Sequence, residues 1–452
     1  MSDAAYKDEM DAEAPPVATE DPAPPPRAGA DETRGAQPAN DQNASEGGLA
    51  PVMKPVPRIT IHAFCEFPES GSTIQRAGED RRLAKAHLTV HMGGVAAAVE
   101  QYQTASTPNL IIVETSASGN ELFSQLGALA EVCDAGTKVI VVGHLNDVSL
   151  YREMIRQGVN EYLVAPLKPL AVIEAVSRLY IDPDAPPIGR TIAFMGAKGG
   201  VGSSTLAHNI GWSISTSFNE DVVIADLDLP FGTAGLDFNQ DPAQGIADAL
   251  TAPERLDDVL LDRLLVKCTD RLSLFAAPAV LDREYEVDTE SCESVIEIVR
   301  AGVPCVIVDL PHIWSPWTKK ALLAADEVVI TAMPDLASLR NTKNLVDLIR
   351  QARPNDTPPR IVLNQVGVPK RPEIPAKDFA EAIGMDPALV IPFNPGLFGA
   401  AANNGQMLEE LEPKGKTSDN LRDLAQMLCG REANAGKARK SFSLKKLFSR
   451  KA

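Results

Sequence analysis

The stretch from Thr191 to Asn209, TIAFMGAKGGVGSSTLAHN, decides the fold of the longer part of this chain. It consists of a short apolar run, a glycine-rich turn and a helix-forming segment. Glycine tolerates backbone angles that a Cβ forbids, so Gly199, Gly200 and Gly202 can turn successive N–H groups onto one anion at the helix N-terminus. Ser204 stands in the first helical turn, where a hydroxyl can hold a magnesium ion that accompanies phosphates. The stretch predicts a phosphate site, with a plain strand-to-helix connection as the alternative.

The turn departs from the usual P-loop, G-x-x-x-x-G-K-[ST], at two positions. Ala197 replaces the first glycine and Ser203 replaces the lysine, while a lysine occurs earlier, at Lys198. The pattern K-G-G-V-G resembles the deviant P-loop family that includes ParA and MinD. The resemblance implies that Lys198 acts in catalysis by reaching the nucleotide of a second subunit, in a dimer that encloses ATP. It also implies that the whole turn binds the nucleotide, through Ala197, Lys198, Gly199, Gly200, Val201, Gly202, Ser203, Ser204 and Thr205.

Three aspartates follow later strands of the same domain. Asp226 and Asp228 end the segment DVVIADLD, and Asp309 ends the apolar run VPCVIVD. Carboxyl ends of parallel strands meet at the edge where open α/β sheets bind ligands. Capping of the next helix is the alternative for each aspartate taken alone. The resemblance implies that Asp226 and Asp309 join Ser204 around magnesium, and that Asp228 is catalytic and positions the attacking water.

An adenine site is implied by the resemblance at two later positions. Asn364 lies in the segment PRIVLNQVG, after its apolar run, and Pro392 and Phe393 lie in the turn IPFN, which ends at Asn394. An ordinary turn asparagine is the alternative for Asn364. His208 and His312 have no metal-ligand companions at useful spacing and are interpreted as structural. Trp212, Trp314 and Trp317 are interpreted as packing residues or as part of a partner surface.

The preceding segment, residues 58–183, alternates strand and helix patterns and predicts a second parallel doubly wound sheet. It resembles a response-regulator receiver domain, notably in G-V-N-E-Y-L-V-A-P. The residues that carry receiver chemistry are replaced: Glu114 stands for the phosphoacceptor aspartate, Gly143 for the threonine and Ala165 for the lysine. Phe64 and Cys65 stand where an acidic pair is expected. We interpret this segment as a pseudo-receiver for docking or dimerisation; for Glu114, mimicry of the phosphorylated state is the alternative to a structural substitution.

The termini differ in composition from the two α/β domains, which we place at residues 58–183 and 188–430. Residues 1–57 are rich in Ala, Pro, Asp and Glu, which predicts a disordered arm that is either solubilising or a binding arm. Residues 431–452 are basic, and Leu444, Leu447 and Phe448 form one apolar stripe if the segment is helical. We expect an anchor to an anionic membrane surface, with a disordered tail or a protein-docking helix as alternatives.

Composition narrows the possible functions. The formal net charge of −18 disfavours non-specific nucleic-acid binding by the bulk surface. The six cysteines lack C-x-x-C spacing, which is typical of reduced thiols rather than a metal site or a disulfide framework. There is no signal peptide and no run long enough to cross a bilayer, so a cytoplasmic protein is expected.

The combination of acidic arm, pseudo-receiver and deviant P-loop domain resembles the CpaE and TadZ proteins of Flp (Tad) pilus assembly, over most of residues 58–430. The resemblance implies an ATP- and Mg²⁺-dependent dimer with weak hydrolysis, which marks a cell pole or membrane site. The implied partners are the pilus secretion ATPase, inner-membrane platform proteins or a polar landmark protein. One alternative is a nucleotide-gated scaffold without useful hydrolysis, and another is a ParA/MinD-like positioning ATPase for other cargo.

Overall fold

The computed structural model describes residues 56–180, 188–279, 281 and 285–430. The predicted tail, and the predicted arm except for its last residues Val56 and Pro57, lie outside the described residues. In the described part of the chain, no helix combines the length and apolar character needed to cross a membrane. All six cysteines lie in the described ranges, where no disulfide joins them.

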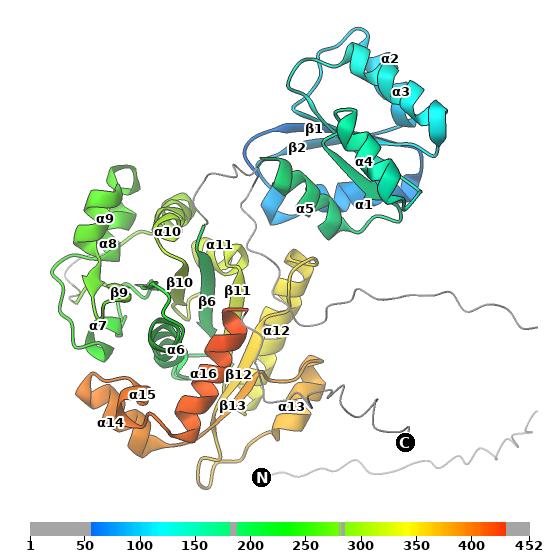
Figure 1. The fold of residues 1–452 in the computed structure, drawn as a ribbon. Coiled ribbons are helices and arrows are strands. Elements are labelled where there is room, and N and C mark those ends of the chain that lie inside the picture. Colours follow the sequence, from blue (N-terminus) through cyan, green and yellow to red (C-terminus); the bar gives the residue numbers. More distant parts are fainter. Residues whose placement is uncertain (1–55, 181–187, 280, 282–284, 431–452) are drawn as a thin grey trace, which may run out of the picture. The chain divides into compact units, whose positions relative to one another are not determined.

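The first sheet is entirely parallel and has the strand order β2-β1-β3-β4-β5. It lies in the blue to blue-green part of the ribbon in Figure 1, where its helices are labelled. Helices cover both of its faces, with α1 and α5 packed over one core and α2, α3 and α4 over the other. The predicted doubly wound, receiver-like fold is therefore confirmed. Its strands are β1 (Thr60–Cys65), β2 (His87–Met92), β3 (Leu110–Glu114), β4 (Lys138–Gly143) and β5 (Glu161–Val164). Its helices are α1 (Pro68–Gly78), η1 (Arg81–Leu83), α2 (Gly94–Tyr102), α3 (Gly119–Val132), α4 (Val148–Arg156) and α5 (Pro169–Tyr180).

Sequence patterns did not predict α1 and β2. The helix α1 reads PESGSTIQRAG, and its Gly, Ser and Thr residues have low helix propensity. The strand β2 lies at the edge of the sheet and is half-buried at most, so it lacks the apolar run that marks a central strand. Packing against the sheet forms both elements where the local signal is weak.

The second sheet has the order β13-β12-β11-β6-β10-β7-β9-β8, and all strands except β8 are parallel. The hairpin of β8 and β9, absent from the prediction, extends one edge of the sheet. Its strands are β6 (Arg190–Gly196), β7 (Val222–Asp226), β8 (Val266–Lys267), β9 (Leu272–Phe275), β10 (Cys305–Leu310), β11 (Glu327–Ala332), β12 (Arg360–Val366) and β13 (Leu389–Pro392). Its helices are α6 (Ser203–Ser217), α7 (Ala234–Asp237), α8 (Ile246–Thr251), η2 (Pro253–Arg255), α9 (Asp258–Leu264), α10 (Thr289–Gly302), α11 (Pro316–Ala324), α12 (Leu336–Ala352), α13 (Ala376–Ile383), α14 (Pro395–Asn404), α15 (Leu408–Leu411) and α16 (Lys416–Leu428).

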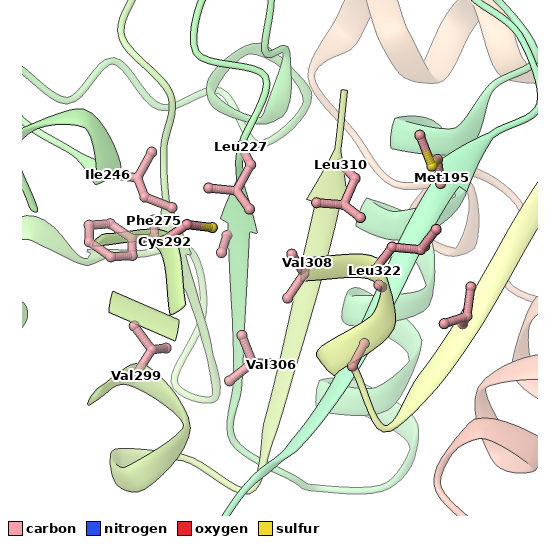
Figure 2. Packing of buried hydrophobic residues seen from close by; sticks show 14 of the residues in the cluster. Met195, Leu227, Ile246, Phe275, Cys292, Val299, Val306, Val308, Leu310 and Leu322 are labelled. Atoms are coloured by element: carbon pink, nitrogen blue, oxygen red, sulfur yellow. The ribbon is translucent and has the colours of Figure 1, made fainter. Parts of the chain in front are cut away.

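Strand β10 shows how the core aims a functional side chain. Val306, Val308 and Leu310 point into the core on one face of the sheet (Figure 2), while Ile307 packs on the opposite face with α6. Because successive strand residues alternate between faces, Asp309 shares the face of Ile307. The alternation therefore directs Asp309 toward α6, the helix that follows the glycine-rich turn.

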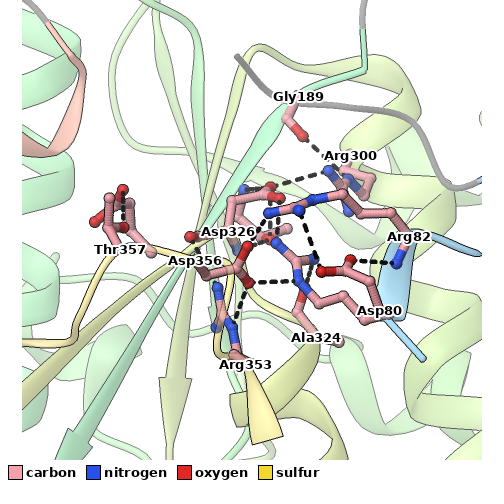
Figure 3. A network of polar contacts seen from close by, with 12 residues as sticks. Asp80, Arg82, Gly189, Arg300, Ala324, Asp326, Arg353, Asp356 and Thr357 are labelled. Atoms are coloured by element: carbon pink, nitrogen blue, oxygen red, sulfur yellow. Dashed lines mark hydrogen bonds and ion pairs between the residues drawn. The ribbon is translucent and has the colours of Figure 1, made fainter. Parts of the chain in front are cut away.

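A polar network ties together the amino ends of the strands in the second sheet (Figure 3). Asp326, just before β11, accepts hydrogen bonds from the Thr191 backbone N–H and from Arg300, both at 2.9 Å. Arg300 also donates to the Gly189 carbonyl at 3.0 Å and is buried. The network fixes the start of β6 beneath the glycine-rich turn at the other end of that strand.

We predict that Asp326→Ala lowers the free energy of unfolding by about 3 kcal/mol, because it leaves the buried Arg300 guanidinium without its carboxylate. Chemical denaturation measures the change. Asp347→Ala is the matched control, since it breaks an exposed pair with Lys343 on α12 and should cost under about 0.5 kcal/mol. Equal effects of the two substitutions would contradict this account of the network.

Candidate functional site

The glycine-rich turn connects β6 to α6. Gly200 and Gly202 have φ values of +77° and +87°, the left-handed region that favours glycine, whereas Gly199 does not. A Cβ built on Gly199 or Gly200 would meet no atom within 4 Å, so the outer side of the turn is open. The turn therefore has the left-handed glycine conformations of a phosphate loop and free space in front of it.

Side chains from β12, from the segment after β10 and from α12 donate hydrogen bonds to the carbonyl groups of this turn. A trans peptide unit directs its N–H opposite to its C=O, so this fixes neighbouring N–H groups toward the open side. An array of fixed N–H groups at a helix N-terminus is suited to bind an anion. The donors are His312 to Gly196 (2.9 Å), Asn341 to Ala197 (2.8 Å), Gln365 to Gly200 (3.0 Å) and Asn364 to Val201 (2.8 Å).

The residues predicted for adenine lie in two different environments. Asn364 is buried against the turn, where a Cβ on Gly202 would approach its Nδ2 atom to 2.6 Å. Pro392 and Phe393 are exposed at the end of β13, and the Phe393 N–H donates to Val366 at 2.8 Å. Asn394 caps α14 through the Leu397 N–H. The structure gives Asn364 a supporting contact with the turn, and the adenine contacts remain predictions.

The strand-end carboxylates meet beside the turn. Asp309 and Asp226 are direct partners in the register of β10 and β7, and both are buried. Asp226 accepts hydrogen bonds from the backbone N–H groups of Asp228 (3.1 Å) and Ala234 (3.2 Å). Burial, with the nearby charge of Asp309, raises the pKa of Asp226 to about 7. Asp228 is half-buried, accepts from the Phe231 N–H at 3.2 Å, and has a pKa raised by burial.

His208 on α6 completes this carboxylate cluster, although sequence reasoning interpreted it as structural. Its Nδ1 atom lies 2.7 Å from Oδ2 of Asp237, and its Nε2 atom lies 3.6 Å from Oδ2 of Asp309. Burial alone would lower the pKa of His208, but the two carboxylates raise it to about 10. The available sequence signal was its spacing, because His208 follows Ser204 by one helical turn on the same face of α6.

The donor set fits magnesium held partly by phosphates. The described residues contain no ready-made group of three or more His, Cys, Asp or Glu ligands. Magnesium in nucleotide sites needs few protein ligands, because phosphates and water complete its octahedron. The Ser203 hydroxyl and Oδ1 of Asp309 are buried without a hydrogen-bond partner among the described residues. Ser204 and Asp309 would hold the ion, and Asp226 is the neighbouring carboxylate on β7.

Lys198 is held by its own chain. Its ammonium group lies 2.6 Å from Oδ2 of Asp335, and both side chains are about one-third exposed. Partial burial opposes ionisation of Asp335, but the Lys198 ammonium and the Ser338 N–H lower its pKa overall. Asp335 also caps α12 through that N–H, at 2.8 Å. Any contact of Lys198 with a second subunit must replace this internal ion pair.

The corresponding edge of the first sheet is closed by Glu114. One carboxylate oxygen accepts from the backbone N–H groups of Glu66 (2.9 Å) and Phe67 (3.0 Å), and the other accepts from the Ser70 hydroxyl (2.5 Å). His144 Nε2 lies 3.5 Å away, and Glu114 is buried. The donors that surround this position are thus already bonded to a carboxylate of the chain itself.

We predict that acetyl phosphate with Mg²⁺ leaves residues 58–183 unphosphorylated, because Glu114 is fully hydrogen-bonded and Gly143 and Ala165 supply no hydroxyl or ammonium group. Intact-mass spectrometry detects the phosphoryl group, with an active receiver domain as positive control. Glu114→Asp should also stay unmodified, since it restores the acceptor alone. Acid-labile phosphate on the wild-type protein would refute this interpretation.

Comparison with known proteins agrees with the geometry of the second sheet. A family model described as an AAA domain matches residues 189–360. The septum site-determining protein MinD of Synechocystis is 27% identical over 164 residues, which cover 36% of this chain and 60% of MinD. The chain therefore spans less than two thirds of that relative. The glycine-rich turn, the carboxylate pair and the sheet define a ParA/MinD-type P-loop domain.

The N-terminal part has relatives of higher identity. The pilus assembly protein CpaE from Caulobacter crescentus is 53% identical, with 28% of this chain and 98% of that chain covered and a TM-score of 0.28. A putative CpaE2 pilus assembly protein from Sinorhizobium meliloti is 41% identical, with 26% and 98% covered and a TM-score of 0.26. The chain belongs to the CpaE family.

Proposed function

We propose that this protein is an ATP-binding localisation and assembly factor for a pilus machine, which switches by Mg²⁺- and ATP-dependent dimerisation and hydrolyses ATP slowly. The observation that carries the proposal is the P-loop, whose carbonyls are held from behind while its front is open, at the same sheet edge as Asp226 and Asp309. Membership of the CpaE family supports the assignment to pilus assembly.

The residues divide the chemistry between them. The N–H groups of Lys198 to Gly202 would bind phosphate oxygens, and Ser204 and Asp309 would hold magnesium. Asp228 lies at the same edge and would orient a water molecule toward the terminal phosphate. Bound Mg-ATP supplies the phosphoanhydride bond whose presence or absence distinguishes the two states of the switch.

A set of exposed apolar side chains, called the apolar rim here, follows three strands that end at this edge, and it supports dimerisation there. Five large apolar side chains in the segments after β7, β10 and β11 are at least half exposed, which is uncommon unless they form an interface. Lys198 lies next to this rim, because its partner Asp335 directly precedes Leu336. The rim consists of Phe231 (72% exposed), Leu236 (72%), Ile313 (51%), Trp314 (55%) and Leu336 (74%).

We predict that ATP with Mg²⁺ doubles the mass of the wild-type protein in light scattering and that Lys198→Ala stays monomeric. Asp335→Asn should dimerise at about two- to fivefold lower ATP concentration, because it releases Lys198 from a partly exposed ion pair worth about 0.5–1 kcal/mol. Asparagine still caps α12, so the helix is kept. A wild-type mass that ATP leaves unchanged would refute the dimer proposal.

A nucleotide-gated scaffold without useful hydrolysis is the second candidate. Ser203 occupies the position of the P-loop lysine, and its buried hydroxyl has no hydrogen-bond partner among the described residues. One missing charge-assisted contact lowers binding by about 1.5–3 kcal/mol, a loss that cellular ATP concentrations would offset. The rate of hydrolysis would fall further if the transition state needs the positive charge of that lysine.

We predict slow, sustained phosphate release by the wild-type protein that falls at least about tenfold in Asp228→Ala, since that substitution removes the group that orients water. Nucleotide binding, followed with a fluorescent ATP analogue, should stay within a few-fold of wild type. Binding without any phosphate release in the wild type would favour the scaffold.

The proposed partners follow from the family. They are a pilus secretion ATPase, inner-membrane platform proteins or a polar landmark protein, with the basic segment 431–452 as a contact to anionic membrane. Dimerisation would raise the effective concentration of two such segments on one surface. A nucleotide-dependent dimer would therefore localise in a nucleotide-dependent way.

A further inference from the structure

His208 connects three parts of the P-loop domain, namely α6, α7 and the end of β10. Nucleotide binding alone does not require these connections. His208 projects from α6, lies 2.7 Å from Asp237 at the end of α7, and lies 3.6 Å from Asp309 at the end of β10. Ser204 stands one helical turn before it on the same face of α6. The His208 imidazole therefore connects α6, the Asp309 carboxylate on β10, and α7, which ends the segment 226–237.

The two contacts of His208 are unequal. The Nδ1 contact with Asp237 has hydrogen-bond length, whereas 3.6 Å between Nε2 and Asp309 exceeds the usual range. The Nε2 atom of His208 and the Oδ1 atom of Asp309 are both buried without hydrogen-bond partners in the described part of the chain. The hydrogen bond with Asp237 thus fixes the imidazole ring, and its Nε2 atom faces Asp309 without a hydrogen bond of its own.

A purely structural role does not explain this arrangement well. Well-packed apolar residues in place of a buried ion pair are often neutral or stabilising, so stability alone does not require a histidine here. Groups that hydrogen-bond to a metal ligand orient that ligand, and their removal typically weakens metal binding by about 10–100-fold. The position of His208 behind Asp309 corresponds to such a group.

We propose that His208 is a positioning residue of the magnesium site, which orients the Asp309 carboxylate and links it to α7 through Asp237. This inference rests on the proposed nucleotide binding. It adds that the arrival of the metal at Asp309 and the placement of residues 226–237 depend on each other, because both act on the same imidazole.

The experiment compares the affinity for a fluorescent ATP analogue in Mg²⁺ and in EDTA. His208→Leu should reduce the ratio of the two affinities about 10–100-fold, while the affinity in EDTA stays within about twofold of wild type. Ser213→Ala is the matched control, because it removes a buried side chain of α6 that donates to a different carboxylate, Glu409. The control should lower the Tm, if anything, and keep the wild-type ratio.

Asp237→Asn tests the link to α7 and serves if His208→Leu does not fold. It should lower the same affinity ratio, and the double variant should lose no more than the larger single effect, because both substitutions break one unit. His208→Gln, which retains one donor, should keep part of the ratio.

The outcomes separate the two proposals. A wild-type ratio in both His208→Leu and Asp237→Asn, or an equal loss of affinity in Mg²⁺ and EDTA, would overturn the role of His208 and leave nucleotide binding intact. A wild-type protein that binds the analogue in neither condition would overturn the proposed function, and this inference with it.

Discussion

The site depends on the hydrogen bonds that hold the carbonyl groups of the glycine-rich turn. A segment with three glycines loses much conformational entropy when it is ordered, so it needs contacts that fix its backbone. Each hydrogen bond contributes about 0.5–1.5 kcal/mol, and the four donors come from three later segments of the domain. The turn thus reaches its anion-binding shape only after β10, α12 and β12 have assembled around β6.

A second constraint is the burial of like charges. Asp226 and Asp309 are neighbours on adjacent strands, and their repulsion without a cation would oppose folding of this edge. His208 lies 3.6 Å from Asp309, while Lys198 forms an ion pair with Asp335. An internal histidine therefore lies close enough to Asp309 to offset part of this repulsion, and the open front of the turn is separate from that contact.

The sequence predicted those parts of the site that depend on local pattern and strand ends. Gly200, Gly202 and the two paired aspartates are found at one sheet edge because parallel strands place their carboxyl ends together. His208, Asp237 and Asp335 were not predicted as site residues, because their roles arise only when α6, α7 and α12 pack against the sheet. The strand β2 and the hairpin of β8 and β9 were missed for a related reason, since edge strands lack long apolar runs.

The two sheets differ in which backbone groups are hydrogen-bonded to side chains at their equivalent edges. In the first, Glu114 accepts the N–H groups of Glu66 and Phe67 and the Ser70 hydroxyl, so a carboxylate of the chain takes the place that an added anion would need. In the second, the side chains that contact the turn in the described part of the chain bond to its carbonyl groups, and its outer side is open there. A ligand shifts an equilibrium only through a site that it can occupy. Under the proposed function, the nucleotide state of the second sheet would therefore be the variable input, and the receiver-like domain would be a surface of fixed chemistry.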